Sequence, residues 1–294
     1  MSLEQVAAIA AGLRADTAPL TPLERRARFE QYYGSLPIPS DVTVEEVRIH
    51  DNLGGKLVRA PGADPAHVLL WLHGGAFFLG SSHSYRDFAA RASAASGWSV
   101  LVPDYRLIPE HRFPAAHEDT LAALDWLDRQ SLAHIAIGGD SAGGNLAVGA
   151  VQARIASGSP APDALWLVSP YLDLTHTGAS IAARAHRDPF IPVAGMALTA
   201  RGYLGDHDPR DPRASPLFGP VDGFPPTLIQ VGSEEVLFDD SARFAERLRA
   251  AASAPVFQEW VGMLHVWPMS AGQLDEGQWA IEQGGAFLRQ RAQP

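Results

Sequence analysis

Short apolar runs alternate with longer helical stretches along most of the chain. The runs show little polar alternation, which is typical of strands buried on both faces of a parallel sheet. The sequence therefore predicts an α/β fold, with a mostly parallel central sheet flanked by helices. The expected strands are Val42–Ile49, Leu57–Arg59, Val68–Leu72, Ser99–Val102, Ile135–Ile137, Leu165–Val168, Thr227–Val231 and Val256–Trp260. The expected helices are Tyr85–Ser96, Ala115–Asp128, Asn145–Ala156, Asp239–Ala252 and Trp279–Arg291.

Two segments interrupt this alternation. Residues 1–40 predict two helices with a break at Thr17–Pro22, and residues 179–222 hold six prolines around a helical piece at Met196–Tyr203. A long insertion in a compact fold usually serves a function, for instance as a lid. We expect both segments to form a cap over the carboxyl edge of the sheet, above a domain made of residues 41–178 and 223–294.

The amino-acid composition excludes several kinds of functional site and partner. The 294 residues include no Cys, which excludes disulfides, thiolate metal sites and a Cys nucleophile. The net charge of −10 disfavours nucleic acid as a partner. No window approaches the roughly 18 consecutive apolar residues of a membrane-spanning helix. The first residues carry Glu4 and no basic side chain before a short apolar run, so no signal peptide is expected and the predicted location is cytoplasmic.

The most informative motif is Gly139-Asp140-Ser141-Ala142-Gly143, between an expected strand and an expected helix. A nucleophile on such a turn adopts a strained backbone that projects its hydroxyl away from the sheet. That turn crowds the positions two before and two after it, where the sequence has glycine. Ser141 is therefore the candidate nucleophile.

A second motif, His73-Gly74-Gly75-Ala76, follows the strand Val68–Leu72. Glycines let a loop turn its N–H groups toward the negative charge of a tetrahedral intermediate. We expect the amides of Gly74, Gly75 and Ala142 to form this oxyanion hole. Three aromatic residues are candidates for an apolar substrate wall, although each would also suit the core: Phe77, Phe78 and Trp267.

These motifs together resemble the bacterial hormone-sensitive-lipase-like family of α/β-hydrolase esterases, over nearly the full length. The resemblance also covers Asp104–Ala116, Arg213–Leu217 and Gly262–His265. It implies an α/β-hydrolase fold, an N-terminal cap, a Ser–acid–His triad and the hydrolysis of short- to medium-chain acyl esters. A weaker resemblance links the chain to monoterpene ε-lactone hydrolases. Family members often pair through an edge strand, which implies a possible homodimer.

The remaining triad members follow from topology. His265 comes after the last strand, where the base of an α/β-hydrolase lies. Along the chain, the acid of the triad should come after the nucleophile and before the base. Four acidic residues follow closely after the strand Thr227–Val231 in this interval. We expect Glu235, with Asp239 left as an alternative. Neither a metal nor a cofactor is expected, because no cluster has metal-ligand spacing.

Two departures from the family pattern stand out. Ala76 replaces the third glycine of the usual His-Gly-Gly-Gly loop, and Glu235 stands where the family usually has Asp. Three residues in Asp104–Ala116 are expected to form a buried ion-pair network: Asp104, Arg106 and Glu110. The resemblance thus predicts a serine carboxylesterase acting on a small-molecule ester. A lactone hydrolase or amidase with the same triad, or a non-catalytic small-molecule receptor, are the alternatives.

Overall fold

The computed structural model describes residues 3–15 and 20–291. The strands in that part of the chain are β1 (Thr43–His50), β2 (Leu53–Arg59), β3 (Asp64–Leu72), β4 (Trp98–Pro103), β5 (His134–Asp140), β6 (Ala164–Val168), β7 (Thr227–Gly232) and β8 (Val256–Trp260). They form one sheet in the order β1-β2-β4-β3-β5-β6-β7-β8. β2 pairs antiparallel with β1 and with β4, and all other neighbours are parallel. The predicted mostly parallel sheet is confirmed.

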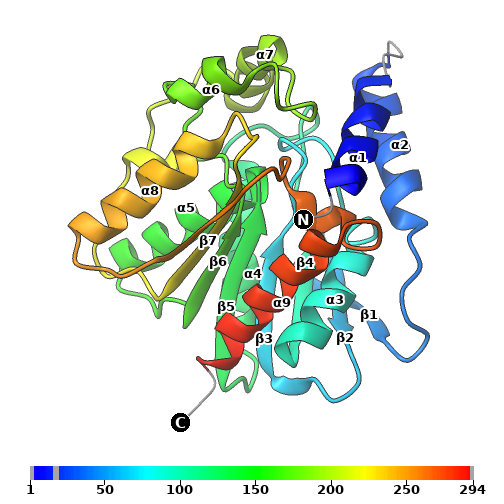
Figure 1. The fold of residues 1–294 in the computed structure, drawn as a ribbon. Helices are drawn as coiled ribbons and strands as arrows, with labels where there is room; N and C mark the ends of the chain where they lie inside the picture. The colour runs from blue at the N-terminus through cyan, green and yellow to red at the C-terminus, as the bar shows by residue number, and fades with distance from the viewer. Residues whose placement is uncertain (1–2, 16–19, 292–294) are drawn as a thin grey trace.

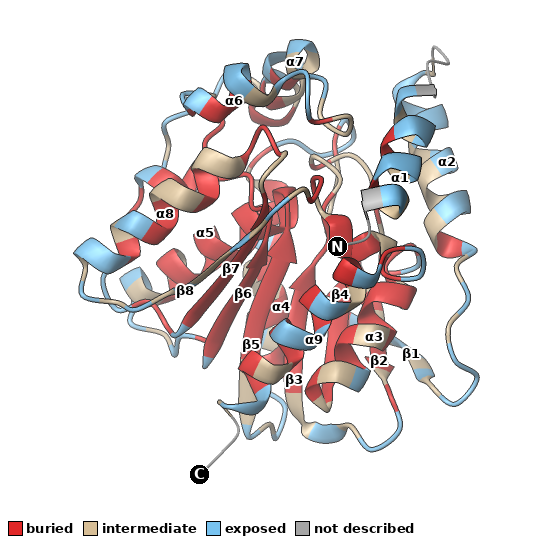
Figure 2. Cartoon of the chain, viewed as in Figure 1, coloured by how far each residue is buried: buried red, intermediate tan, exposed pale blue. Residues whose placement is uncertain are grey.

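The sheet is covered on both faces (Figure 1). The α-helices in the described part of the chain are α1 (Leu3–Ala15), α2 (Pro22–Gly34), α3 (Arg86–Ser96), α4 (Ala115–Asp128), α5 (Ala142–Ser157), α6 (Ala179–Arg184), α7 (Val193–Leu204), α8 (Phe238–Ala250) and α9 (Asp275–Arg289). α3 and α9 pack on one face in one apolar cluster, and α4, α5 and α8 contribute to the cluster on the other. Figure 2 shows the central strands buried and the outer helix surfaces exposed. Burial on two faces explains why the strands lack polar alternation.

Several element boundaries differ from the prediction by one to four residues, and glycines explain two of them. β2 begins at Leu53, because Gly54 and Gly55 join the ladder with β1 instead of forming a turn. A Cβ on Gly55 would lie 2.4 Å from the carbonyl oxygen of Val102, so glycine permits this close pairing. α9 begins at Asp275, earlier than predicted, and Gly277 in its first turn packs against the backbone of Trp267. The helical spacing of apolar residues is interrupted in this first turn of α9, so the sequence pattern did not predict the turn as helix.

Both expected cap segments lie beyond the carboxyl edge of the sheet, with α1 and α2 on one side and α6 and α7 on the other (Figure 1). Arg26 in α2 donates hydrogen bonds to the carbonyl oxygens of Phe78 (2.8 Å) and Ile108 (2.6 Å). Asp188, in the second segment, accepts one from the Val236 amide (3.0 Å). The predicted break between the first two helices lies partly outside the described residues. The domain boundaries stay a prediction.

The expected buried network in Asp104–Ala116 is wrong. Asp104 accepts hydrogen bonds from the amide and hydroxyl of Ser82. Arg106 forms an ion pair with Asp119 in α4, and the partly exposed Glu110 forms one with α2. The three side chains thus have different partners, and no hydrogen bond or ion pair joins them to one another among the described residues.

Candidate active site

Ser141 occupies the sharp turn between β5 and α5. Its backbone has φ 51° and ψ −118°, a strained conformation for a residue with a Cβ. Its amide donates to the carbonyl oxygen of Val168 (3.0 Å), which fixes the turn against β6. A Cβ on Gly143 would lie 1.8 Å from the carbonyl oxygen of Leu72, and one on Gly139 would lie 2.5 Å from the backbone of Gly143. The crowding expected from the motif is present.

Three side chains from separate loops converge at this turn. The Ser141 Oγ lies 3.0 Å from Nε2 of His265. The Nδ1 of His265 lies 2.8 Å from Oε2 of Glu235. All three residues are buried, and Glu235 is completely so. The arrangement couples a hydroxyl, an imidazole and a carboxylate in one hydrogen-bonded line.

Glu235 is held by further donors. Its Oε1 accepts hydrogen bonds from the Gly232 amide (2.6 Å) and from the hydroxyl of Ser169 (2.7 Å). Ser169 also accepts one from the amide of Val266, next to His265 (3.2 Å). Sequence analysis missed Ser169, which lies directly after β6 at the carboxyl edge. This serine ties the acid loop to the histidine loop.

The other three acids after β7 have different partners. Glu234 forms an ion pair with Arg187. Asp239 accepts a hydrogen bond from the Ser180 amide (2.9 Å), and Asp240 accepts two from the chain after β6. Asp239 and Asp240 thus anchor neighbouring segments, and Asp239 makes no contact with the histidine. The geometry favours Glu235 over the Asp239 alternative.

The electrostatics favour proton uptake by the histidine. Burial by itself lowers the pKa of His265, but the hydrogen bond and charge of Glu235 outweigh it. The charges of Asp188 and Asp140 act in the same direction. The pKa of His265 is therefore raised above its ordinary 6.5.

The oxyanion loop corrects one expectation. The amide of Gly74 donates to the hydroxyl of Tyr85 (2.9 Å), so it is directed away from the oxyanion position. Gly75 and Ala76 follow with φ of 112° and 54°. Among the described residues, the N–H groups of Gly75, Ala76 and Ala142 have no backbone or side-chain acceptor. The structure thus leaves Gly75 and Ala142 available and replaces Gly74 with Ala76.

The aromatic candidates have different surroundings. Phe77 is fully buried, with its ring stacked on Tyr203 at a centroid distance of 3.7 Å. Trp267 is also buried, and its indole N–H donates to the carbonyl oxygen of Glu276. Both rings pack against protein side chains or backbone, and their expected contact with substrate stays a prediction. Phe78 is only partly buried, and its own carbonyl oxygen accepts the hydrogen bond from Arg26.

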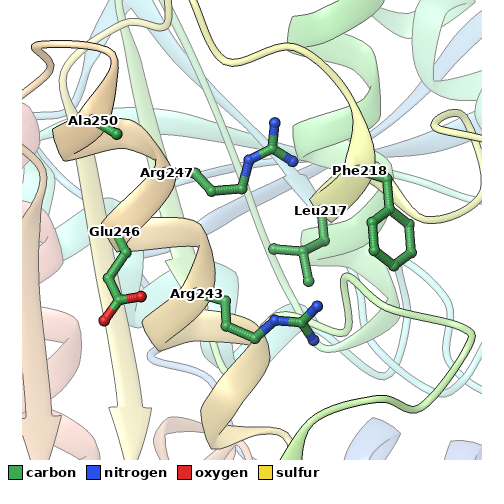
Figure 3. Close-up of a pocket in the computed structure, with 6 residues that line it drawn as sticks. All are labelled: Leu217, Phe218, Arg243, Glu246, Arg247 and Ala250. Atoms are coloured by element: carbon green, nitrogen blue, oxygen red, sulfur yellow. The ribbon is translucent and has the colours of Figure 1, made fainter.

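A separate depression lies between α8 and the turn Pro216–Phe218 (Figure 3). Its lining residues are Leu217, Phe218, Arg243, Glu246, Arg247 and Ala250. Arg243 pairs with Asp173, and Arg247 donates to a backbone carbonyl, so both guanidinium groups have partners. No triad residue lines it. Among the described residues, no cluster of three His, Asp or Glu could hold a metal ion, and no helix is long and apolar enough to cross a membrane.

Comparison with known proteins agrees with this architecture. A family model described as alpha/beta hydrolase fold matches residues 69–269. An acetyl-hydrolase from Streptomyces hygroscopicus is 42% identical over 265 residues, covering 89% of this chain and 87% of that protein. An esterase from Acinetobacter venetianus is 34% identical over 266 residues, with the same two coverages.

Solved structures extend the comparison. An esterase from the bacterial hormone-sensitive lipase family has a TM-score of 0.94 at 37% identity, covering 99% of both chains. The structure of EstE5 soaked with p-nitrophenyl butyrate has a TM-score of 0.93 at 35% identity, covering 98% of both. The chain therefore belongs to the alpha/beta hydrolase fold family, among the bacterial hormone-sensitive-lipase-like esterases. It is a carboxylic ester hydrolase.

Proposed function

We propose that the chain is a serine carboxylesterase with the triad Ser141, His265 and Glu235. The observation that carries this proposal is the continuous line of contacts, 3.0 Å from hydroxyl to imidazole and 2.8 Å from imidazole to carboxylate. These distances allow a proton to move from Ser141 to His265 as the hydroxyl attacks. Glu235 then selects the required tautomer and stabilises the imidazolium.

The reaction passes through an acyl-enzyme. Ser141 Oγ bonds to the ester carbonyl carbon while its proton moves to Nε2 of His265. The tetrahedral intermediate collapses, the C–O bond to the alcohol breaks, and His265 returns the proton to the leaving oxygen. Water then attacks the acyl-enzyme by the same route and releases the carboxylic acid.

The proposed oxyanion donors are the amides of Gly75, Ala76 and Ala142. The last lies at the start of α5, where the helix dipole also favours negative charge. Losing one such donor costs roughly 2.7–4 kcal/mol of transition-state stabilisation in a related site. The main-chain path of the loop therefore contributes more to the rate than its side chains do.

The proposed substrates are short- to medium-chain acyl esters. One similar protein is named an acetyl-hydrolase, and crystals of another similar protein, EstE5, were soaked with a butyrate ester. Because the chain is an ester hydrolase, the receptor alternative is wrong. Lactones and amides remain alternative substrates for the same triad, and a panel of acyl esters, lactones and amides would rank them. The absence of nucleic acid partners and the cytoplasmic location stay predictions.

We also propose a homodimer formed through β8, one of the two edge strands of the sheet. Its outer backbone groups face no other strand among the described residues. Val261 and Trp279 lie beside it with 63% and 49% of their surface exposed. A second copy of β8, related by a two-fold axis, would pair with these groups and cover both side chains.

Ser141→Ala should lower kcat for p-nitrophenyl acetate by about 10⁴-fold or more, because no other group can form the acyl-enzyme. The midpoint temperature of thermal unfolding should stay close to that of the wild type, which would show that the fold is intact. Ser241→Ala, which removes a buried hydroxyl in α8 that has no partner among the described residues, is the matched control and should retain activity. Ester turnover at the wild-type rate in Ser141→Ala would refute the assignment.

Glu235→Gln should lower kcat by up to about 10⁴-fold, because an amide can neither select the tautomer nor stabilise the imidazolium. Glu234→Gln is the adjacent control: it removes the charge that pairs with Arg187 and alters the acceptor of the Ser233 hydroxyl, and it should lower kcat little. The assignment of the acid fails if the two variants lose activity equally. Steady-state kinetics with one ester are sufficient for the comparison.

The acid limb of the kcat/KM profile should have its midpoint above pH 6.5. Only neutral His265 can accept the proton from Ser141, and its pKa is raised by Glu235 against the effect of burial. Activity is therefore present above that pKa and lost as the pH falls through it. A profile that stays flat from about pH 8 to about pH 5 would contradict a histidine base.

The dimer proposal predicts twice the mass of one chain by light scattering after size exclusion. The double variant Val261→Glu, Trp279→Glu should elute as a monomer, because it buries charge in the proposed interface. Leu198→Glu, at an exposed position on α7, is the control and should remain dimeric. A monomeric wild-type protein would overturn the proposal.

A further inference from the structure

A buried chain of hydrogen bonds lies beneath the active site, and the mechanism above does not use it. The Gly74 amide donates to Tyr85 Oη (2.9 Å), and Tyr85 Oη donates to Oδ2 of Asp140 (2.8 Å). The Nε1 of Trp71 donates to the other oxygen of Asp140 (3.1 Å). Tyr85 and Asp140 are each 2% exposed. The chain thus connects the residue before the nucleophile to the first glycine of the oxyanion loop.

The direction of these bonds follows from the groups involved. A tyrosine hydroxyl has one proton, and here its oxygen accepts from Gly74, so the proton is left for Asp140. An ionised carboxylate accepts from both Tyr85 and Trp71, and bonds to a charged acceptor are stronger than neutral ones. Asp140 therefore orients Tyr85, and Tyr85 in turn orients the Gly74 amide.

The surroundings leave the loop little freedom to turn otherwise. A Cβ on Gly74 would lie 2.1 Å from Oδ2 of Asp140, so the carboxylate packs directly on this backbone. The carbonyl oxygen of Gly74 lies 2.8 Å from Nδ1 of His73, and the carbonyl oxygen of His73 accepts from Tyr105 (2.7 Å). The peptide groups on both sides of the Gly74 α-carbon are thus held. Their orientation sets the direction in which the chain enters Gly75 and Ala76.

We propose that Tyr85 and Asp140 are positioning residues for the oxyanion hole. By holding the Gly74 amide away from the substrate, they direct the next two N–H groups toward the oxygen of the ester carbonyl whose carbon Ser141 attacks. This role rests on the proposed function. In this proposal Asp140, the residue before the nucleophile, orients the oxyanion loop in addition to forming part of the nucleophile turn.

Asp140 has a second consequence for the same reaction. Its charge is one of those that raise the pKa of His265. Burial raises the pKa of Asp140 itself to about 6, against the opposing effect of its donors. The titratable groups that face Asp140 are Tyr33, Tyr85, Tyr105 and His265. The tyrosine pKa values are all raised, so near neutral pH His265 is the group that changes charge beside it.

Tyr85→Phe tests the hydroxyl alone. It keeps the ring but leaves the Gly74 amide and one oxygen of Asp140 without their partner. We expect kcat to fall about tenfold to a hundredfold with KM nearly unchanged, less than the roughly 10²–10³-fold loss for a missing oxyanion donor. Tyr203→Phe is the matched control, because it removes another buried tyrosine hydroxyl, one with no partner in the described structure. The proposal is overturned if both variants keep the wild-type kcat or lose it equally.

Asp140→Asn tests the charge. We expect a lower kcat and an acid limb of kcat/KM shifted to lower pH, because the histidine loses a neighbouring negative charge. A purely structural role would lower the yield of folded enzyme without moving the limb. An unshifted limb with an unchanged kcat would reject the role of Asp140. Turnover that survives Ser141→Ala would instead refute the proposed function, so the two failures are distinguishable.

Discussion

The close contact between α5 and β3 is the constraint on which the site depends. Gly143 approaches the Leu72 carbonyl so closely that any side chain at that position would separate the two elements. This contact forces the turn at Ser141 into positive φ, which lifts the hydroxyl above the sheet. It also places the start of α5 beside the loop that follows β3. The proposed nucleophile and the proposed oxyanion donors are thus positioned by one packing interaction.

Negative charge around the histidine is the second organising feature. Glu235 contacts the imidazole directly, whereas Asp140 and Asp188 act at longer range. Each carboxylate is buried and also accepts hydrogen bonds from backbone or side-chain donors. Buried charges of this kind persist only when such donors compensate for lost solvation. The same groups that hold the loops in place therefore also tune the proton acceptor.

The segments above the sheet are connected to these loops. Arg26 of α2 bonds to the carbonyl oxygen of Phe78, directly beside the oxyanion loop, and to that of Ile108. Asp188 bonds to the amide of Val236, next to the proposed acid. A movement of either segment would therefore be transmitted to one side of the reaction centre. The cap role expected for them stays a prediction.

The sequence alone determined the α/β layout, the turn at Ser141 and the order of the proposed triad residues, because apolar runs and glycine spacing are local signals. The acid needed the tertiary structure, since four carboxylates follow β7 and only three-dimensional contacts separate them. The choice of the proposed oxyanion amides also depended on the tertiary structure, because the hydroxyl of Tyr85, at the start of α3, accepts the hydrogen bond of the Gly74 amide. The surroundings of Phe77 and Trp267 also needed the tertiary structure, because an apolar side chain suits a core and a substrate wall equally and only the packing shows that both rings are buried.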